Sequence, residues 1–251
     1  MKRELYSLRN EEFAYFAHLV AEKLTELERP YLIVGGTAVQ AYTLEGLCKS
    51  NNATVVELDN DRNRRFQDVL RATDDLDLAL KFPKDMEDSK KANVIFSFLE
   101  GIRGEHLSPN HIIEYRFDRS GHQRPRFSIT VDEQQGESVA LNISRRPQDL
   151  KGLPIEFYDY FIDEGVTLDI PYNSDFLLKL RVPRIEHVIA AKVSHFREKD
   201  AADLMSLAKA SRLRGELDLG EIEKILLPVY ERRYDRFRHL VEEDIPYNPV
   251  S

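Results

Sequence analysis

The first part of the chain changes from helical to strand-like spacing of its apolar residues and back. After Asn10, a residue type that caps helices, apolar residues recur at three- and four-residue steps, which predicts an amphipathic helix over 11–28. A short apolar run follows at 31–34, two glycines close it, and the apolar residues of 38–47 indicate a second helix. We therefore expect a strand, a glycine turn and a helix in direct succession.

The middle of the chain is dominated by strand-like spacing. The run 75–82 alternates between apolar and polar residues and predicts a strand, whereas 85–102 has helical spacing. Four further strand-like runs, each bounded by Gly, Pro, Asp or Asn, lie at 111–117, 126–131, 139–144 and 155–162. The segment 49–67 is polar and poorly periodic, so we expect it to be a loop or insertion.

From Pro183 onward the apolar spacing is helical. The predicted helices cover 185–196, 201–210, 222–227 and 230–241. Mixed elements followed by helices predict an α/β (α+β) fold, in which a mixed sheet is flanked by helices and a helical C-terminal region packs against it. We assign 1–175 to the α/β domain and 176–251 to the helical region.

The composition fits a globular protein, and it excludes several kinds of site and of cellular location. With 42% hydrophobic and 32% charged residues, the chain can build a core and keep a polar surface. Its net charge of −8 argues against indiscriminate coating of nucleic acid, which needs many Lys and Arg contacts to phosphate. Cys48 is the only cysteine, which excludes an intramolecular disulfide and a multi-cysteine zinc site. The single cysteine favours a reducing, cytoplasmic setting. No stretch has the roughly 18 apolar residues of a membrane span, so we expect no membrane contact.

The predicted strand at 75–82 carries the most informative chemistry. Alternate side chains of a strand share a face, so the leucines lie on one face and Asp75 and Asp77 on the other. Two neighbouring carboxylates repel each other, and a divalent cation neutralises them, with Mg²⁺ the natural occupant. The alternative is an edge strand whose acids are simply solvated.

Gly35 and Gly36 stand between the first predicted strand and the second predicted helix. Glycines at such a turn let the backbone approach a phosphate, and the helix N-terminus supplies N–H donors and positive potential. A glycine pair alone is usually a tight turn. Combined with the acidic strand that follows, it forms a much rarer pattern than either part alone, which shifts the balance away from a solvated strand and a simple turn.

Three short motifs resemble a known superfamily. Val-Gly-Gly-Thr-Ala at 34–38 and Arg-x-Thr-x-Asp-Leu-Asp at 71–77 resemble the nucleotidyltransferase superfamily with the DNA polymerase β type palm, and within it the AbiEii-type toxin branch. The segment 192–204, Lys-x-x-x-x-Arg-x-Lys-Asp-x-x-Asp-Leu, is similar to a C-terminal signature of that branch.

The resemblance implies transfer of a nucleoside monophosphate from an NTP to an acceptor, with Mg²⁺ as cofactor. The nucleotide-binding residues that it implies are Gly35, Gly36, Thr37, Arg71, Lys192 and Asp200. The catalytic residues that it implies are Asp75, Asp77, a third carboxylate and Lys192, and the three carboxylates would hold the metal.

For the third carboxylate we prefer Asp159 over Asp132, Asp163 and Asp169, because its surroundings are the most strand-like. Lys192 would neutralise phosphate charge as a compact cation. The alternatives are a solvated helix residue for Lys192 and a helix-capping acid for Asp200.

The acceptor and partners follow from resemblance and charge. Toxin relatives favour tRNA or another RNA as acceptor and a cognate antitoxin as partner, in a toxin-antitoxin or phage-defence system. The segment 176–215 has nine Lys and Arg against four acids, so it is a candidate surface for a polyanion, with ordinary helix surface as the alternative. Adenylylation of a protein or small molecule stays open, as does a binding protein that keeps the fold without catalysis.

Overall fold

The structure is a computed structural model. It describes residues 7–60, 73, 75–83, 85–102, 106–108, 111–117, 125–131, 135–144, 160–214 and 217–243. At some positions it describes the backbone alone, among them Asp75 and the strands between 106 and 144. The observed order, mixed elements followed by helices, confirms the predicted fold class.

The N-terminal elements form as their spacing predicts. Helix α1 (Glu11–Glu26) is capped by Asn10, whose side chain accepts a hydrogen bond from the Phe13 backbone N–H at 3.1 Å. Strand β1 (Tyr31–Val34) leads into α2 (Gly35–Asn51) with no residue between them. Residues 37–46 of α2 are all buried, so this helix is enclosed on every side.

The main sheet has the strand order β1-β2-β6-β5-β4-β3. Its further strands are β2 (Asp75–Leu80), β3 (His106–Ser108), β4 (His111–Phe117), β5 (Pro125–Val131) and β6 (Gln135–Ser144). Strand β2 pairs antiparallel with β1 and parallel with β6, and the remaining pairs are antiparallel. Because β2 lies between two strands, the alternative of a solvated edge strand is wrong.

The second half begins with a hairpin and ends in helices. Strands β7 (Val166–Pro171) and β8 (Leu177–Val182) form a separate two-stranded sheet that spans residue 176. Helices α6 (Ile185–His195), α7 (Glu198–Arg214) and α8 (Leu219–Glu243) follow it. Tyr230 has non-helical backbone angles inside α8, which agrees with the predicted break between two helices.

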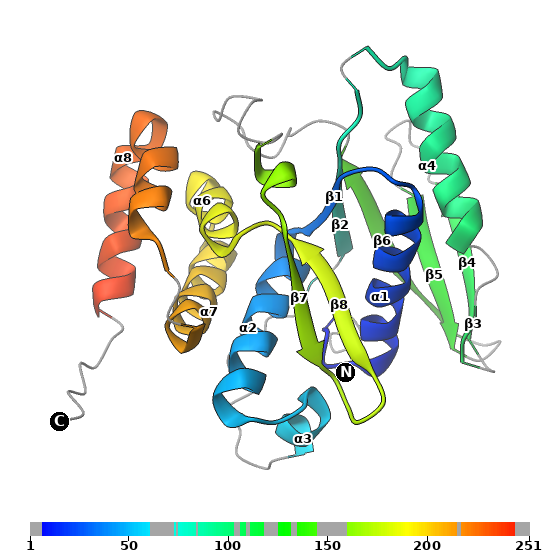
Figure 1. The fold of residues 1–251 in the computed structure, drawn as a ribbon, viewed down its shortest axis with the longest axis horizontal. Helices are drawn as coiled ribbons and strands as arrows, with labels where there is room; N and C mark the ends of the chain where they lie inside the picture. The colour runs from blue at the N-terminus through cyan, green and yellow to red at the C-terminus, as the bar shows by residue number, and fades with distance from the viewer. Residues whose placement is uncertain are drawn as a thin grey trace.

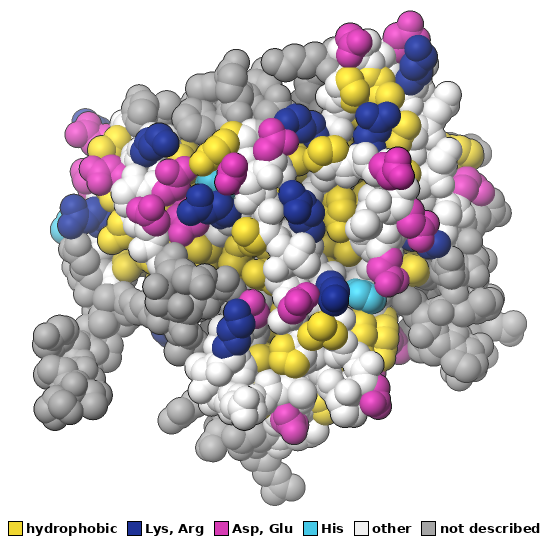
Figure 2. All heavy atoms as spheres, in the orientation of Figure 1, with side chains coloured by type: hydrophobic (Ala, Val, Ile, Leu, Met, Phe, Trp, Pro, Cys, Tyr) yellow, Lys and Arg dark blue, Asp and Glu magenta, His cyan; other side chains and the backbone are white. Residues whose placement is uncertain are grey.

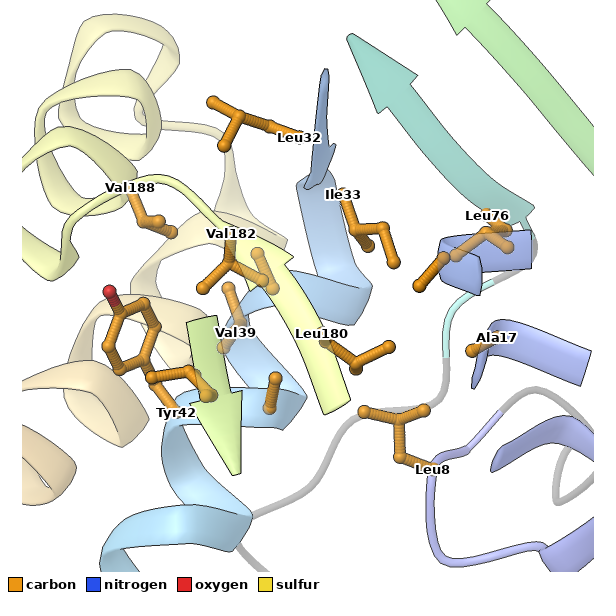
Figure 3. Packing of buried hydrophobic residues seen from close by; sticks show 14 of the residues in the cluster. Leu8, Ala17, Leu32, Ile33, Val39, Tyr42, Leu76, Leu180, Val182 and Val188 are labelled. Atoms are coloured by element: carbon orange, nitrogen blue, oxygen red, sulfur yellow. The ribbon is translucent and has the colours of Figure 1, made fainter. Parts of the chain in front are cut away.

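Helix α2 joins the two halves. It contacts β1, β2 and β7 as well as α6 and α7, and α8 lies outside α6 (Figure 1). Helix α4 (Asp88–Ile102) contacts α1 at the opposite side of the molecule. The core is continuous from Tyr42 and Val188 on the helical side to Ile33 and Leu76 on the sheet side (Figure 3).

Two predictions of local structure are wrong. Part of the predicted loop 49–67 is helical, because α2 extends to Asn51 and α3 (Val55–Asn60) follows it. A capping box starts α3: the Glu57 carboxylate accepts from the Thr54 N–H at 2.7 Å, and Thr54 Oγ1 accepts from the Glu57 N–H at 3.2 Å. Residues 160–163, at the end of the predicted strand 155–162, are helical.

None of the described helices is long and apolar enough to cross a membrane.

Candidate functional site

The turn between β1 and α2 lies against Asp77. Val34, the last residue of β1, is the register partner of Asp77 in β2. Gly35 follows with φ of +69°, a conformation that favours glycine. A Cβ on Gly35 would overlap Asp77 Oδ2 and lie 3.1 Å from its Cγ. The sheet register therefore brings the predicted glycine turn and one predicted acid into direct contact.

The first turn of α2 has unused hydrogen-bonding capacity. Its N-cap residue, Val34, provides no side-chain hydrogen bond, and no acidic residue lies in the first turn. The Thr37 hydroxyl is fully buried and has no hydrogen-bond partner in the described structure. A helix N-terminus of this kind offers N–H donors and positive potential to an anion.

Strand β2 has the two faces that its sequence predicts. Leu76, Leu78 and Leu80 are buried, and Asp77 is half-buried on the other face. Asp75 occupies the matching strand position, although its side chain is outside the description. On β6, the residue paired with Asp77 is Asn142. No acid of β6 thus stands beside Asp77 in the register.

The third carboxylate stays a prediction. Asp159 and Arg71 lie outside the described residues, as does Asp132. Asp163 is exposed and accepts hydrogen bonds from Lys81 Nζ at 2.7 and 2.6 Å. Asp169 is an exposed residue of the separate β7–β8 sheet. Within the described part of the chain, no three His, Cys, Asp or Glu side chains form a group that could hold a metal ion.

Lys192 lies in a buried charged cluster where α6 meets α7. Its Nζ is 2.6 Å from Asp203 Oδ2 and 3.7 Å from Asp200 Oδ1. All three residues are buried. Lys192 is therefore no solvated helix residue, and the structure brings it together with the predicted Asp200. Asp203 is its nearer partner.

Asp200 is held from several sides. It accepts hydrogen bonds from the backbone N–H of Arg197 at 2.8 Å and from its Nε at 2.9 Å. Burial acts to raise the pKa of Asp200, but the hydrogen bonds from Arg197 and the charge of Lys192 outweigh it and leave the pKa lowered. The bond to the Arg197 N–H is that of an acid at the third position of a helix, so the capping role considered for Asp200 is present.

The turn at Gly35 with Asp77 and the charged cluster around Lys192 both adjoin one helix. Helix α2, which begins at Gly35, contacts β2, α6 and α7. The sequence-based prediction names Lys192 and Asp200 as site residues and ranks Asp203 below them. The signal was present in the spacing, because residues three apart on a helix share a face.

His187 of α6 is also buried, but it lies outside the charged cluster of Lys192. Its side chain is fully buried, and neither ring nitrogen has a hydrogen-bond partner in the described structure. The ring stacks on Phe161 with centroids 4.2 Å apart, and its Nε2 is 3.8 Å from Glu221 Oε1. Burial, with a further contribution from Arg184, lowers the pKa of His187 to about 4.

The positive charge of the segment 176–215 is partly neutralised. Lys192 and Arg197 pair with buried acids, and Arg184 Nε lies 3.5 Å from Glu186. On the face shown in Figure 2, positive and negative side chains are interspersed over α6 and α8. Arg212 and Arg214 lie in the last turn of α7, and their side chains are outside the description.

Comparisons with known proteins give a distant likeness. No protein-family model matches the sequence, and no curated protein is detectably similar to it. One similar solved structure is an antigenic nucleotidyltransferase-like protein from Paracoccidioides brasiliensis, with 19% identity, a TM-score of 0.47 and coverage of 94% of each chain. Another is MenT4, a nucleotidyltransferase toxin of Mycobacterium tuberculosis, with 15% identity, a TM-score of 0.43 and coverage of 94% of this chain and 86% of that one.

Proposed function

We propose that the chain is a Mg²⁺-dependent nucleotidyltransferase, which moves a nucleoside monophosphate from an NTP to an acceptor and releases pyrophosphate. The contact between Gly35 and Asp77 carries the proposal. It joins a helix N-terminus suited to phosphate with a carboxylate suited to a metal ion. A phosphate-bound metal needs both within a few ångströms of each other.

The phosphates would lie at the start of α2. Gly35 and Gly36 present backbone N–H groups there without a Cβ to obstruct an approaching anion. The buried Thr37 hydroxyl, which has no hydrogen-bond partner in the described structure, supports the same placement. Arg71 is a further proposed phosphate ligand, on the resemblance alone.

Asp75 and Asp77 fit a Mg²⁺ site. Both stand on the same face of an interior strand, and carboxylate oxygens are the ligands that Mg²⁺ prefers. A bound Mg²⁺ would activate the acceptor hydroxyl and stabilise the pyrophosphate that leaves. Asp159 is the proposed third ligand.

Lys192 would meet the nucleotide from the helical side. Its ammonium has three N–H donors, and its contacts with Asp203 and Asp200 fix its position. Asp200 would act through Lys192 rather than on the phosphates directly, since its carboxylate is fully buried and bound by Arg197.

RNA, and tRNA in particular, is the proposed acceptor, with a cognate antitoxin as a proposed partner. Resemblance to toxin relatives supports both. Adenylylation of a protein or small molecule is the alternative within the same chemistry. The alternative outside it is a binding protein that keeps the fold without catalysis.

The test is incubation of the pure protein with each α-³²P-labelled NTP, Mg²⁺ and either total RNA or cell lysate. We expect one class of macromolecule to become labelled by the wild type and not by Asp75→Asn or Asp77→Asn. Asp175→Asn, which changes an exposed aspartate in the turn between β7 and β8, is the matched control and should keep full activity. Full transfer by Asp77→Asn contradicts the assignment, and NTP binding without any labelled product favours the binding protein.

A further inference from the structure

The chain reverses direction between α6 and α7 at Phe196, and we call this turn the elbow. A phenylalanine does not suit the backbone conformation found there. Phe196, the C-cap of α6, has φ of 44° and ψ of 47°, in the left-handed region. Glycine or asparagine usually occupies such a position, and a bulky side chain there is strained unless its surroundings hold it. Phe196 therefore needs a specific restraint.

Helix α8 provides that restraint. The guanidinium carbon of Arg236 lies 4.5 Å from the centre of the Phe196 ring, within the range of a cation–π interaction. Tyr234 and Phe237 beside it are buried, and they fix the rotation of α8 about its axis. Arg236 is therefore held over the ring by the packing of its own helix.

The elbow determines where the charges of the Lys192 cluster lie. Lys192 and Asp203 are 11 positions apart, and a continuous helix would separate them by about 16 Å along its axis. The left-handed turn at Phe196 folds α7 back, so the two side chains meet at 2.6 Å. Phe196 also donates its N–H to the Lys192 carbonyl at 2.9 Å, which closes the end of α6.

We propose that Arg236 is a positioning residue: by stacking on Phe196 it holds the α6–α7 elbow, and through the elbow it sets the place of Lys192 relative to the nucleotide. The part that concerns the nucleotide rests on the proposed function. The part that concerns the elbow does not depend on catalysis.

The first test measures the elbow itself. Amide hydrogen exchange is compared for the wild type, Arg236→Ala, Arg236→Lys and Arg232→Ala, the last being an exposed arginine of the same helix. We expect Arg236→Ala to speed exchange at the Phe196, Arg197 and Asp200 amides while the melting temperature moves by no more than a few degrees. Arg236→Lys, which keeps the cation, should restore most of the protection, and Arg232→Ala should leave it unchanged.

The second test measures the binding and turnover of the nucleotide. In Arg236→Ala the Kd and KM for the NTP should rise by a factor between about 2 and 30, with partial rescue by Arg236→Lys. The same change made in a Phe196→Leu background should add little, because the ring that Arg236 stacks on is already gone.

The outcomes separate the two proposals. Unchanged amide exchange in Arg236→Ala, or an equal effect from Arg232→Ala, overturns the proposal that Arg236 holds the elbow. Faster exchange with an unchanged Kd and KM overturns the link to Lys192. If the wild type binds no NTP, the proposed function fails, and the exchange data still decide whether Arg236 holds the elbow.

Discussion

Gly35 excludes a side chain for two separate reasons. Its φ of +69° disfavours any residue with a Cβ, and that Cβ would overlap the Asp77 carboxylate. We expect Gly35→Ala to displace Asp77 and abolish nucleotidyl transfer, while it lowers the free energy of unfolding by only about 1–2 kcal/mol. Transfer assays and urea unfolding measure the two effects.

Gly101→Ala is the matched control for that substitution. A Cβ on Gly101 meets no atom within 4 Å, so this variant should keep both activity and stability. Wild-type activity in Gly35→Ala would show that Asp77 need not stay where the register puts it.

His187 should make the protein less stable in mild acid. Its pKa of about 4 in the folded chain lies below the usual 6.5, so the unfolded chain binds more protons between these values. The stabilisation is present above pH 6.5 and is lost as the pH falls towards 4, at a cost of up to about 3 kcal/mol. In His187→Phe, which keeps an aromatic ring against Phe161, the unfolding free energy should fall less between pH 7 and pH 4.5.

Urea titrations at the two pH values measure this difference. His239→Gln changes an exposed histidine of α8 and serves as the control, because it should follow the wild type. Parallel pH profiles of the wild type and His187→Phe would mean that the burial of His187 has no energetic consequence.

Between elements, α2 and α7 approach each other closely at Gly46. A Cβ on Gly46 would lie 3.3 Å from the Cα of Ala210 and 3.4 Å from its carbonyl oxygen. Backbone atoms cannot rotate away, so Gly46→Val should push the helices apart and cost about 1–3 kcal/mol. The melting temperature should fall by several degrees, whereas Gly101→Val, in open space, should leave it nearly unchanged.

Elements with a regular apolar period could be predicted from sequence, and elements set by local polar contacts were missed. Helix α1 and strand β2 follow from spacing, because the apolar residues of α1 lie on one buried face and the leucines of β2 on another. Helix α3 does not, since it depends on the capping box of Thr54 and Glu57. At 160–163, Phe161 and Ile162 are both buried, which suits a helical turn and breaks the alternation of a strand.

The candidate site was predictable to the same extent. Strand parity is enough to place Asp75 and Asp77 on one face. The contact of Asp77 with Gly35 depends on the β1–β2 register, and the pairing of Lys192 with Asp203 depends on a left-handed Phe196. Neither a register nor a left-handed phenylalanine can be read from residue spacing.

At the scale of the whole molecule, docking of RNA on the helical half predicts that the affinity for RNA depends on the salt concentration. Phosphate contacts release counterions, so binding should weaken steeply as salt is added. Arg212→Glu with Arg214→Glu should lower affinity across RNA sequences and reduce the salt slope, while a small-molecule acceptor is still modified. Filter binding or fluorescence anisotropy over a salt series measures both quantities.

A charge-matched control lies at the far side of the molecule. Lys90→Glu with Lys91→Glu changes α4, which Figure 1 shows opposite α7, and should bind RNA as the wild type does. A flat salt dependence, or equal binding by the two double variants, would remove RNA docking on α7 and favour a protein or small-molecule acceptor.

The central position of α2 also has a consequence for synthesis on the ribosome. The Tyr42 hydroxyl donates to the Pro183 carbonyl at 2.7 Å across 141 positions of sequence, and α6 and α7 come later still. At about 5–20 residues per second, α2 waits roughly 7 to 28 s for Pro183 and longer for α6 and α7. During that interval the nascent chain exposes the part of α2 that α6 and α7 cover in the finished protein, so chaperones have access to it.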